Sequence, residues 1–399
     1  MSKKDRLSGN EAIATAMRQI NPDVFAMFPI TPSTEIPQYF AQYVADGRVD
    51  TEFITVESEH SSLSACMGAE AAGCRAITAT SSAGLAYMTE ILYVTASARL
   101  PVVIAVATRA LTGPININND HSDAMAERDT GFIQIFSENN QEAYDNYLQA
   151  HRIGEHPDVR LPVMICEDGF ITSHALENIL IEEDDVVKKF VGEYHPGNYL
   201  LNPNTTLAVG PYGISDYYME ARMAQAEAMK NAKQVILDVA ADFESTFGRH
   251  YGLFEAYRME DAEVALVLMG SSAGTARESI DEMRAQGLRC GLIKVRVFRP
   301  FPAEELANAL SNCKAVAVLD KSEGFSAHGG PLFADTASSC INLEKRPKMI
   351  DIVYGLGGRD FTISQGNRIL IRLQKIADTG ETGPVYTHIG QRDARKEAQ

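Results

Sequence analysis

The chain has 399 residues, 45% of them hydrophobic and 22% charged, which predicts about two domains with well-formed cores. Its formal net charge of −17 argues against a nucleic-acid backbone as the main partner. The six cysteines are scattered without a CxxC pair, so no iron–sulfur cluster, zinc site or disulfide framework is predicted. Residues 1–6 lack an apolar signal core and no apolar run reaches membrane-spanning length, so a cytoplasmic location without membrane contact is expected.

The first feature along the chain is a corner at residues 28–37, FPITPSTEIP, which follows an apolar run at 24–28. The run predicts a buried strand. Proline is accepted at the first helical position because that N–H has no partner, so Pro32 is predicted to open a helix with Thr31 as its N-cap. Such a corner is either an ordinary helix start, which these ten residues alone favour, or a preformed seat for an anion.

Short apolar runs then alternate with amphipathic segments. The runs predict buried strands at residues 75–79, 101–107, 162–166, 264–269, 290–295 and 315–319. Amphipathic segments such as 141–153 and 273–286 predict the intervening helices. This alternation indicates an α/β protein with a parallel sheet that is covered on both faces.

A boundary between two domains is predicted near residue 255. Residues 174–206 are acidic and weakly periodic, which predicts an excursion across the surface, and residues 217–247 read as a long charged helix. A new strand–turn–helix unit begins at MEDAEVALVLMGSSAGTARESIDEM (259–283). The expected domains are therefore residues 1–255 and 256–399.

Two segments after strands carry candidate chemistry. In ESEHSS (57–62), Glu57 or Glu59 stands between a strand and a helix, where burial would raise the pKa of the carboxyl and suit it to proton transfer. The more ordinary explanation is that both acids complement the helix dipole. In TSSAGLAYM (80–88), the backbone can approach a cofactor ring, or the glycine only relieves crowding.

The most informative segment is the long polar loop at 108–131, TRALTGPININNDHSDAMAERDTG, because long irregular loops in compact domains are usually functional. Arg109 at its start can hold a carboxylate through two parallel hydrogen bonds. The spacing in NDHSD fits no standard metal site, so no metal is predicted there. GSSAGTARE (270–278) lacks the P-loop lysine and the GxGxxG pattern, so it is a weak signal for phosphate binding.

The order of these segments is more specific than any one of them. The four segments at 28–40, 56–73, 78–88 and 108–131 are followed downstream by VRVFRPFPAEEL (295–306) and KSEGFSAHGGPLF (321–333). Over residues 7–375 the chain resembles the alpha subunits of 2-oxoacid:ferredoxin oxidoreductases, most closely the pyruvate members. The resemblance implies a thiamine-diphosphate-binding, pyrimidine-type parallel-sheet domain followed by a transketolase C-terminal-like α/β domain.

The resemblance also implies roles for particular residues. Glu59 matches the family glutamate that hydrogen-bonds the aminopyrimidine ring of thiamine diphosphate and serves as the catalytic acid–base group. Pro29 and Ser82 are expected beside the cofactor. Thr31 and Arg109 match residues that hold the 2-oxoacid carboxylate. The family commonly has an aromatic residue at position 118, so Asn118 predicts a wider or more polar substrate pocket.

The implied reaction converts a 2-oxoacid, with pyruvate favoured, and coenzyme A to acyl-CoA, CO2 and reduced ferredoxin. Thiamine diphosphate would be shared with a beta subunit that holds its magnesium, and gamma and delta subunits would complete the complex, with [4Fe-4S] clusters on partner subunits. Open alternatives are a bulkier 2-oxoacid (an aryl glyoxylate or 2-oxoisovalerate), another electron acceptor, and a non-catalytic scaffold. A transketolase-like enzyme complete in one chain is disfavoured, because the sequence has no GDG…N motif for magnesium diphosphate.

Overall fold

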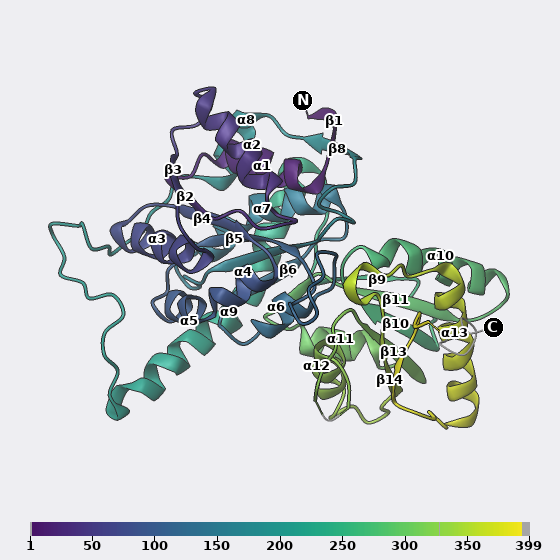
Figure 1. Ribbon diagram of the computed structural model, residues 1–399. Helices are drawn as coiled ribbons and strands as arrows, with labels where there is room; N and C mark the ends of the chain where they lie inside the picture. Colours follow the sequence, from purple (N-terminus) through teal and green to yellow (C-terminus); the bar gives the residue numbers. More distant parts are fainter. Residues whose placement is uncertain (1, 327, 393–399) are drawn as a thin grey trace.

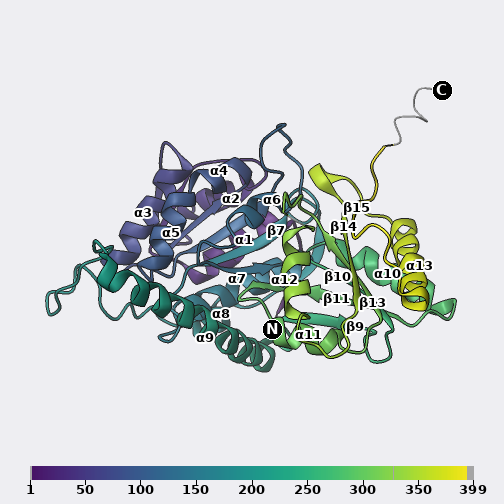
Figure 2. The same ribbon diagram turned by 90° about the horizontal axis from the view of Figure 1, so that it is seen from below.

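The computed structural model describes residues 2–326 and 328–392, which form two lobes that lie side by side (Figure 1). Each lobe contains a mostly parallel sheet with helices packed on it (Figures 1 and 2). The chain enters the second lobe near residue 254 and returns once, because β12 (Val297–Arg299) joins the first sheet. A search of the described helices finds none with both the length and the apolar character that a bilayer crossing requires.

The first lobe is built on a seven-stranded sheet with the order β12-β6-β7-β5-β4-β2-β3. Strands β2 to β7 are parallel, and β12 runs antiparallel to β6. Every residue of β4, β5 and β7 is buried, as expected for central strands covered on both faces. The strands are β2 (Val24–Met27), β3 (Glu52–Thr55), β4 (Ala76–Thr80), β5 (Val103–Thr108), β6 (Ile133–Phe136) and β7 (Val163–Asp168).

Helices cover the two faces of this sheet because successive strand residues point to opposite sides. Val103 packs on one face in a cluster with α1 (Gly9–Ile20), α2 (Glu35–Ala45) and α7 (Asn140–Gly154). Its neighbour Ile104 packs on the other face, which is covered by α3 (Glu59–Ala72), α4 (Ser82–Tyr87), α5 (Thr89–Ser97) and α6 (Ser122–Ala126). The second cluster continues into the other lobe.

The second lobe contains a six-stranded sheet with the order β15-β14-β13-β10-β11-β9. Its strands are parallel except for β9, which is antiparallel to β11. The strands are β9 (Phe254–Tyr257), β10 (Val264–Leu268), β11 (Cys290–Val295), β13 (Ala315–Asp320), β14 (Lys348–Val353) and β15 (Tyr386–His388). The helices are α10 (Ser272–Ala285), α11 (Ala303–Leu310), α12 (Pro331–Ser339) and α13 (Ile363–Thr379), with a 3-10 turn at Leu356–Gly358.

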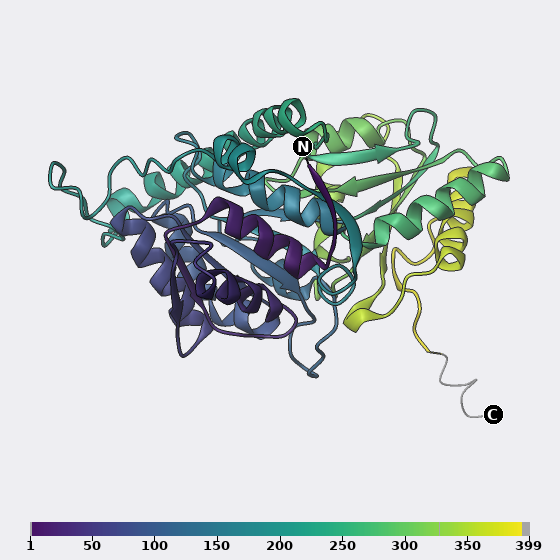
Figure 3. The ribbon, with the colours of Figure 1, turned by 90° about the horizontal axis from the view of Figure 1, so that it is seen from above.

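An arm at residues 192–214 and the start of α9 (Ser215–Phe247) lie at the end of the first lobe that is opposite the second lobe (Figure 3). Part of the arm packs on the first lobe, where Leu200 N donates to Ala71 O at 2.8 Å. Several large apolar side chains on this segment are exposed, among them Tyr212, Tyr217, Met219 and Met223. Before the arm, β1 (Lys3–Leu7) pairs antiparallel with β8 (Glu177–Ile181), and α8 (Asp184–Val191) follows.

The predicted strands and helices are all present, with ends that coincide or differ by one or two residues. The predicted surface excursion at 174–206 includes two regular elements, β8 and α8. One local prediction is wrong. The helix after the corner begins at Glu35 rather than Pro32, and Thr31 is not its N-cap. The proline inside this helix is Pro37 rather than Pro32. It lies in the first turn, where backbone N–H groups have no acceptor within the helix, so its missing N–H costs no hydrogen bond.

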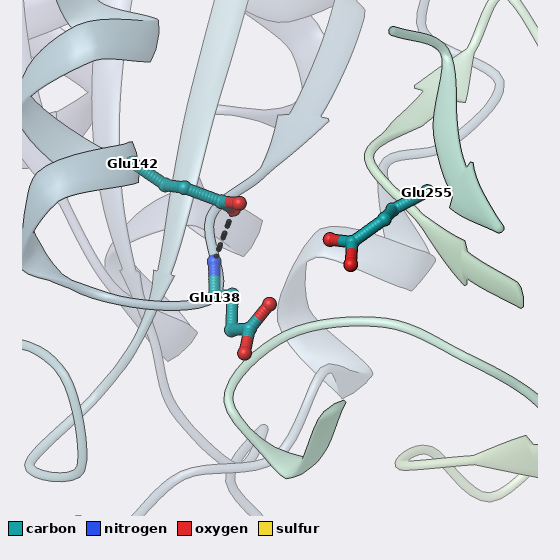
Figure 4. A group of neighbouring side chains, drawn as sticks. All are labelled: Glu138, Glu142 and Glu255. Carbon is teal, nitrogen blue, oxygen red and sulfur yellow. Dashed lines mark hydrogen bonds between the residues drawn. The ribbon is translucent and has the colours of Figure 1, made fainter. Parts of the chain in front are cut away.

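An ion-pair network joins the two lobes where β11 leads into β12. Three carboxylates, those of Glu138, Glu142 and Glu255, approach one another closely enough to suggest a metal site (Figure 4). The ammonium of buried Lys294 already lies among them, 2.9 Å from Glu138, 2.5 Å from Glu142 and 3.2 Å from Glu255. Arg277 also pairs with Glu138 and Glu255. Each carboxylate is therefore paired with a protein cation, and the cluster ties the two lobes together.

Candidate active site

Glu59 lies at the carboxyl edge of the first sheet, as the first residue of α3 after the N-cap Ser58. Its side chain is buried, and none of the described residues forms a hydrogen bond or ion pair with its carboxylate. Gly84 of α4 faces it so closely that a Cβ there would lie 2.7 Å from Glu59 Oε1 and 2.6 Å from Thr80 Oγ1. The Thr80 hydroxyl is also buried and has no partner among the described residues. Glu59, Thr80 and Gly84 thus form a cradle with unused polar atoms.

Arg109 follows β5 and is buried, with its guanidinium held in place by two backbone carbonyls. Nε donates to Asn116 O at 3.0 Å, and Nη1 donates to Thr31 O at 2.8 Å. No described carboxylate forms an ion pair with this side chain, and no described residue accepts a hydrogen bond from Nη2. A buried cation with unused donors is costly unless an anion completes it, so this group is equipped to receive a carboxylate.

The corner at 28–37 places Thr31 against Arg109. Asn10 of α1 donates from Nδ2 to Pro32 O at 2.9 Å, and the Ser33 hydroxyl donates to Ile30 O at 2.9 Å. The peptide between Thr31 and Pro32 is cis. Thr31 itself is exposed, and its carbonyl rather than its hydroxyl contacts Arg109. The hydroxyl is therefore available to a ligand, whereas the predicted helix-start N–H groups lie at Glu35 and beyond.

Asp123 connects two predicted site residues that the sequence places far apart. Its Oδ2 accepts the backbone N–H groups of Ser82, at 2.8 Å, and Arg109, at 2.9 Å. Burial raises the pKa of this carboxyl to about 7, against the lowering effect of the backbone donors. Ser82 has a left-handed backbone (φ 45°) and donates its hydroxyl to Ala110 O at 2.7 Å. Asp123 therefore fixes the loop of Arg109 to the start of α4.

The other predicted site residues lie farther from this centre of buried groups. Pro29 is exposed on the corner. Asn118 is exposed on the loop, where its carbonyl accepts from Ala110 N at 3.0 Å and its Cβ faces Gly358 of the second lobe. A cleft of about 950 Å³ opens between this loop and residues 322–326, 329–331 and 356–357 of the second lobe. Arg128 and Arg299 line the cleft together with four acidic residues, Asp120, Asp129, Glu323 and Asp335.

A buried charged cluster ties the second lobe to the same sheet edge. Asp168, at the end of β7, accepts from Lys321 Nζ at 2.9 Å and from the Ser271 hydroxyl at 2.5 Å, and its Oδ1 lies 2.8 Å from His121 Nε2. Burial opposes ionisation of Asp168, but the charges of Lys321 and His121 outweigh it and hold its pKa well below the ordinary value. Within the NDHSD segment, His121 contacts Asp168 and Asp123 holds the backbone of Ser82 and Arg109.

The segment 80–88, which contains Gly84, was expected either to let the backbone approach a cofactor ring or to use the glycine only to relieve crowding. Thr80, Asn116, Asp123 and Asp168 were not predicted as parts of the site, because their partners are distant in sequence.

Two family models match the chain. One, described as pyruvate flavodoxin/ferredoxin oxidoreductase, thiamine-diphosphate-binding, matches residues 15–241. The other, pyruvate:ferredoxin oxidoreductase core domain II, matches residues 262–365. The molecule is thus an α/β protein of the thiamine-diphosphate-binding class, with a transketolase-like second lobe, which confirms the predicted fold. It belongs to the pyruvate:ferredoxin oxidoreductase family, as an alpha-type subunit.

Curated relatives agree with this assignment. The chain is 53% identical to pyruvate synthase subunit PorA of Thermotoga maritima, over 89% of this chain and 90% of the relative. It is 44% identical to PorA of Pyrococcus furiosus, over 97% of each chain. It is also 40% identical to ketoisovalerate oxidoreductase subunit VorA of Pyrococcus horikoshii, over 95% of each.

Solved structures with low sequence identity share the fold. A 2-oxoglutarate:ferredoxin oxidoreductase from Magnetococcus marinus superposes with a TM-score of 0.69 at 20% identity, covering 94% of this chain and 65%, just under two thirds, of that longer one. A split-gene transketolase superposes with a TM-score of 0.54 at 12% identity, covering 93% of this chain and 99% of the other.

Proposed function

We propose that this chain, together with partner subunits, catalyses the oxidative decarboxylation of a 2-oxoacid, with pyruvate favoured. Coenzyme A receives the acyl group, CO2 leaves, and two electrons pass through [4Fe-4S] clusters of partner subunits to ferredoxin. The observation that carries this proposal is the buried carboxylate of Glu59, which has no partner among the described residues and faces the cradle at Gly84.

The cradle fits the pyrimidine half of thiamine diphosphate. It offers two polar groups, the Glu59 carboxyl and the Thr80 hydroxyl, which have no hydrogen-bond partner among the described residues. The absence of a side chain on Gly84 leaves space next to them. When bound, the cofactor supplies a nucleophilic carbon and an electron sink for loss of CO2. Glu59 holds a proton at a pyrimidine ring nitrogen, a task that suits a carboxyl screened from water. Pro29 and Ser82 flank the cofactor, Ser82 chiefly by holding Ala110 and the start of α4 in place.

Arg109 and Thr31 hold the substrate carboxylate, Arg109 with Nη2 and Thr31 with its free hydroxyl. The carbonyls of Asn116 and Thr31 orient the guanidinium before substrate arrives, which reduces the entropy lost on binding. Asn118 contributes to substrate choice from the rim of the loop. The PorA relatives, with identities up to 53%, support pyruvate, and the 40% identity to VorA makes 2-oxoisovalerate the second candidate.

Partner subunits complete the site. The sequence has no GDG…N motif, so we assign the magnesium and diphosphate to a beta subunit, and we infer gamma and delta subunits and ferredoxin as the further partners. The exposed apolar side chains of the arm and α9 are of the kind that subunit contacts cover. We assign pyrimidine binding to residues 1–255 and treat 256–399 as the second domain.

The test compares Glu59→Gln with Glu57→Gln in the assembled complex. Glu57 is an exposed glutamate two residues earlier, which makes it a matched control. Glu59→Gln should slow pyruvate- and CoA-dependent ferredoxin reduction, and exchange of the cofactor C2 hydrogen, by about 10²–10⁴-fold, whereas Glu57→Gln should leave both unchanged. Equal exchange rates in all three proteins would refute the role of Glu59. Decarboxylation by the purified single chain would refute the need for partners.

A further inference from the structure

The loop that carries Arg109 is held from the second lobe as well as from the first. We call residues 109–121 the substrate loop and Gly355–Gly358 the glycine turn. Asn116 Nδ2 donates to Gly357 O at 3.2 Å, and Gly357 N donates to Asp120 Oδ2 at 3.2 Å. His121 N donates to Lys321 O at 2.7 Å. The second lobe therefore hydrogen-bonds the substrate loop at its middle and at its end.

Asn116 links the second lobe to the Arg109 guanidinium, because it hydrogen-bonds both. Its side chain reaches Gly357 through Nδ2 and caps Asn118 N through Oδ1 at 2.7 Å, while its backbone carbonyl accepts from Arg109 Nε at 3.0 Å. A shift of Asn116 would move the acceptor that orients Arg109. Asn116 is thus the one described residue that hydrogen-bonds both the glycine turn and the Arg109 side chain.

The glycine turn is shaped for this contact. Gly357 and Gly358 have left-handed backbones, with φ of 63° and 83°. A Cβ on Gly357 would overlap Asn116 Nδ2, and a Cβ on Gly358 would lie 2.5 Å from the Cβ of Asn118. A side chain at either position would push the substrate loop away from the second lobe.

We propose that Asn116 is a positioning residue for Arg109 and that the glycine turn of the second lobe sets the position of the substrate carboxylate. This inference rests on the proposed role of Arg109. Substrate affinity is then determined partly by a lobe that contributes no group to the cofactor cradle.

A double-mutant cycle in the assembled complex tests the inference. Asn116→Ala should lower kcat/KM for pyruvate roughly three- to tenfold, mainly through KM, with unchanged thiamine diphosphate affinity. The same substitution in an Arg109→Lys background should have almost no further effect, because its action passes through the arginine. Full additivity of the two losses, or no loss on Asn116→Ala while Arg109→Lys is impaired, overturns this inference alone. No loss on Arg109→Lys overturns both it and the carboxylate role.

A second pair of variants tests the glycine turn. Gly357→Ala should lower kcat/KM about tenfold or more, because small misplacements of orienting groups are costly. The matched control is Gly383→Ala, where φ is 62° but nothing lies within 4 Å of the added Cβ. Both variants carry the same left-handed strain, so equal kcat/KM values would show that strain alone explains the loss and would refute the role of the turn.

Discussion

Replacement of Gly84 by alanine tests the cradle beside Glu59 without removing any polar group. The added Cβ would lie 2.6 Å from Thr80 Oγ1, 2.7 Å from Glu59 Oε1 and 2.9 Å from Glu59 Cγ, all shorter than van der Waals contact. Overpacking of this kind costs about 1–3 kcal/mol. Alanine regains about 1 kcal/mol of helix propensity over glycine within α4. The net destabilisation should therefore be small, between about 0 and 2 kcal/mol.

Cofactor binding should be weakened even though the fold stays close to wild-type stability, because the added methyl group would displace the Glu59 carboxyl from the position in which it faces the cofactor. The expected result is at least a tenfold weaker binding of thiamine diphosphate to the assembled complex, measured by titration, with a melting temperature close to that of the wild type.

Gly68→Ala is the matched control for this variant. Gly68 lies in the middle of α3 with nothing within 4 Å of an added Cβ, so this variant should be stabilised by about 1 kcal/mol and bind the cofactor normally. Cofactor affinity that is equal in Gly84→Ala and Gly68→Ala would refute the cradle.

Three further predictions concern charged groups. Arg109→Lys keeps the charge but loses the planar donors, and should lower kcat/KM for pyruvate about ten- to a hundredfold; wild-type values with every 2-oxoacid would contradict the carboxylate role. Burial raises the pKa of the Glu70 carboxyl from 4.5 to about 8, so the folded chain keeps a proton that the unfolded chain releases, and this group's contribution to stability is lost as pH rises from about 4.5 to 8. The free energy of unfolding of Glu70→Gln, measured in urea, should therefore rise relative to that of the wild type by about 3–5 kcal/mol between pH 5 and 8. A difference between the two proteins that does not change with pH would contradict this prediction. Asp168→Asn leaves the buried Lys321 ammonium without its carboxylate partner and should cost about 3–5 kcal/mol, whereas Asp184→Asn, at a more exposed ion pair, should cost under about 1; equal melting temperatures would disprove the difference.

The sequence by itself determined the sheet elements, because burial on both faces of a parallel strand requires an uninterrupted apolar run that can be read from neighbouring residues. The runs at 75–79, 101–107 and 162–166 appear as β4, β5 and β7. The order of the motifs identified the family, and the resemblance is the basis on which Glu59 and Arg109 are proposed as site residues. The helix start at residue 35 was missed because two prolines, Pro32 and Pro37, offered equivalent local signals.

Only the tertiary structure decided which groups support these residues. Asp123 binds Ser82 and Arg109 because parallel strands bring their carboxyl ends to one edge of the sheet, whatever their spacing in sequence. Asn116 meets Gly357 across 241 positions, and that contact exists because the second lobe packs against the first where β12 joins its sheet. Local periodicity reports what a residue's neighbours along the chain require, whereas the contacts that orient Arg109 depend on strand order and lobe packing, which no local pattern encodes.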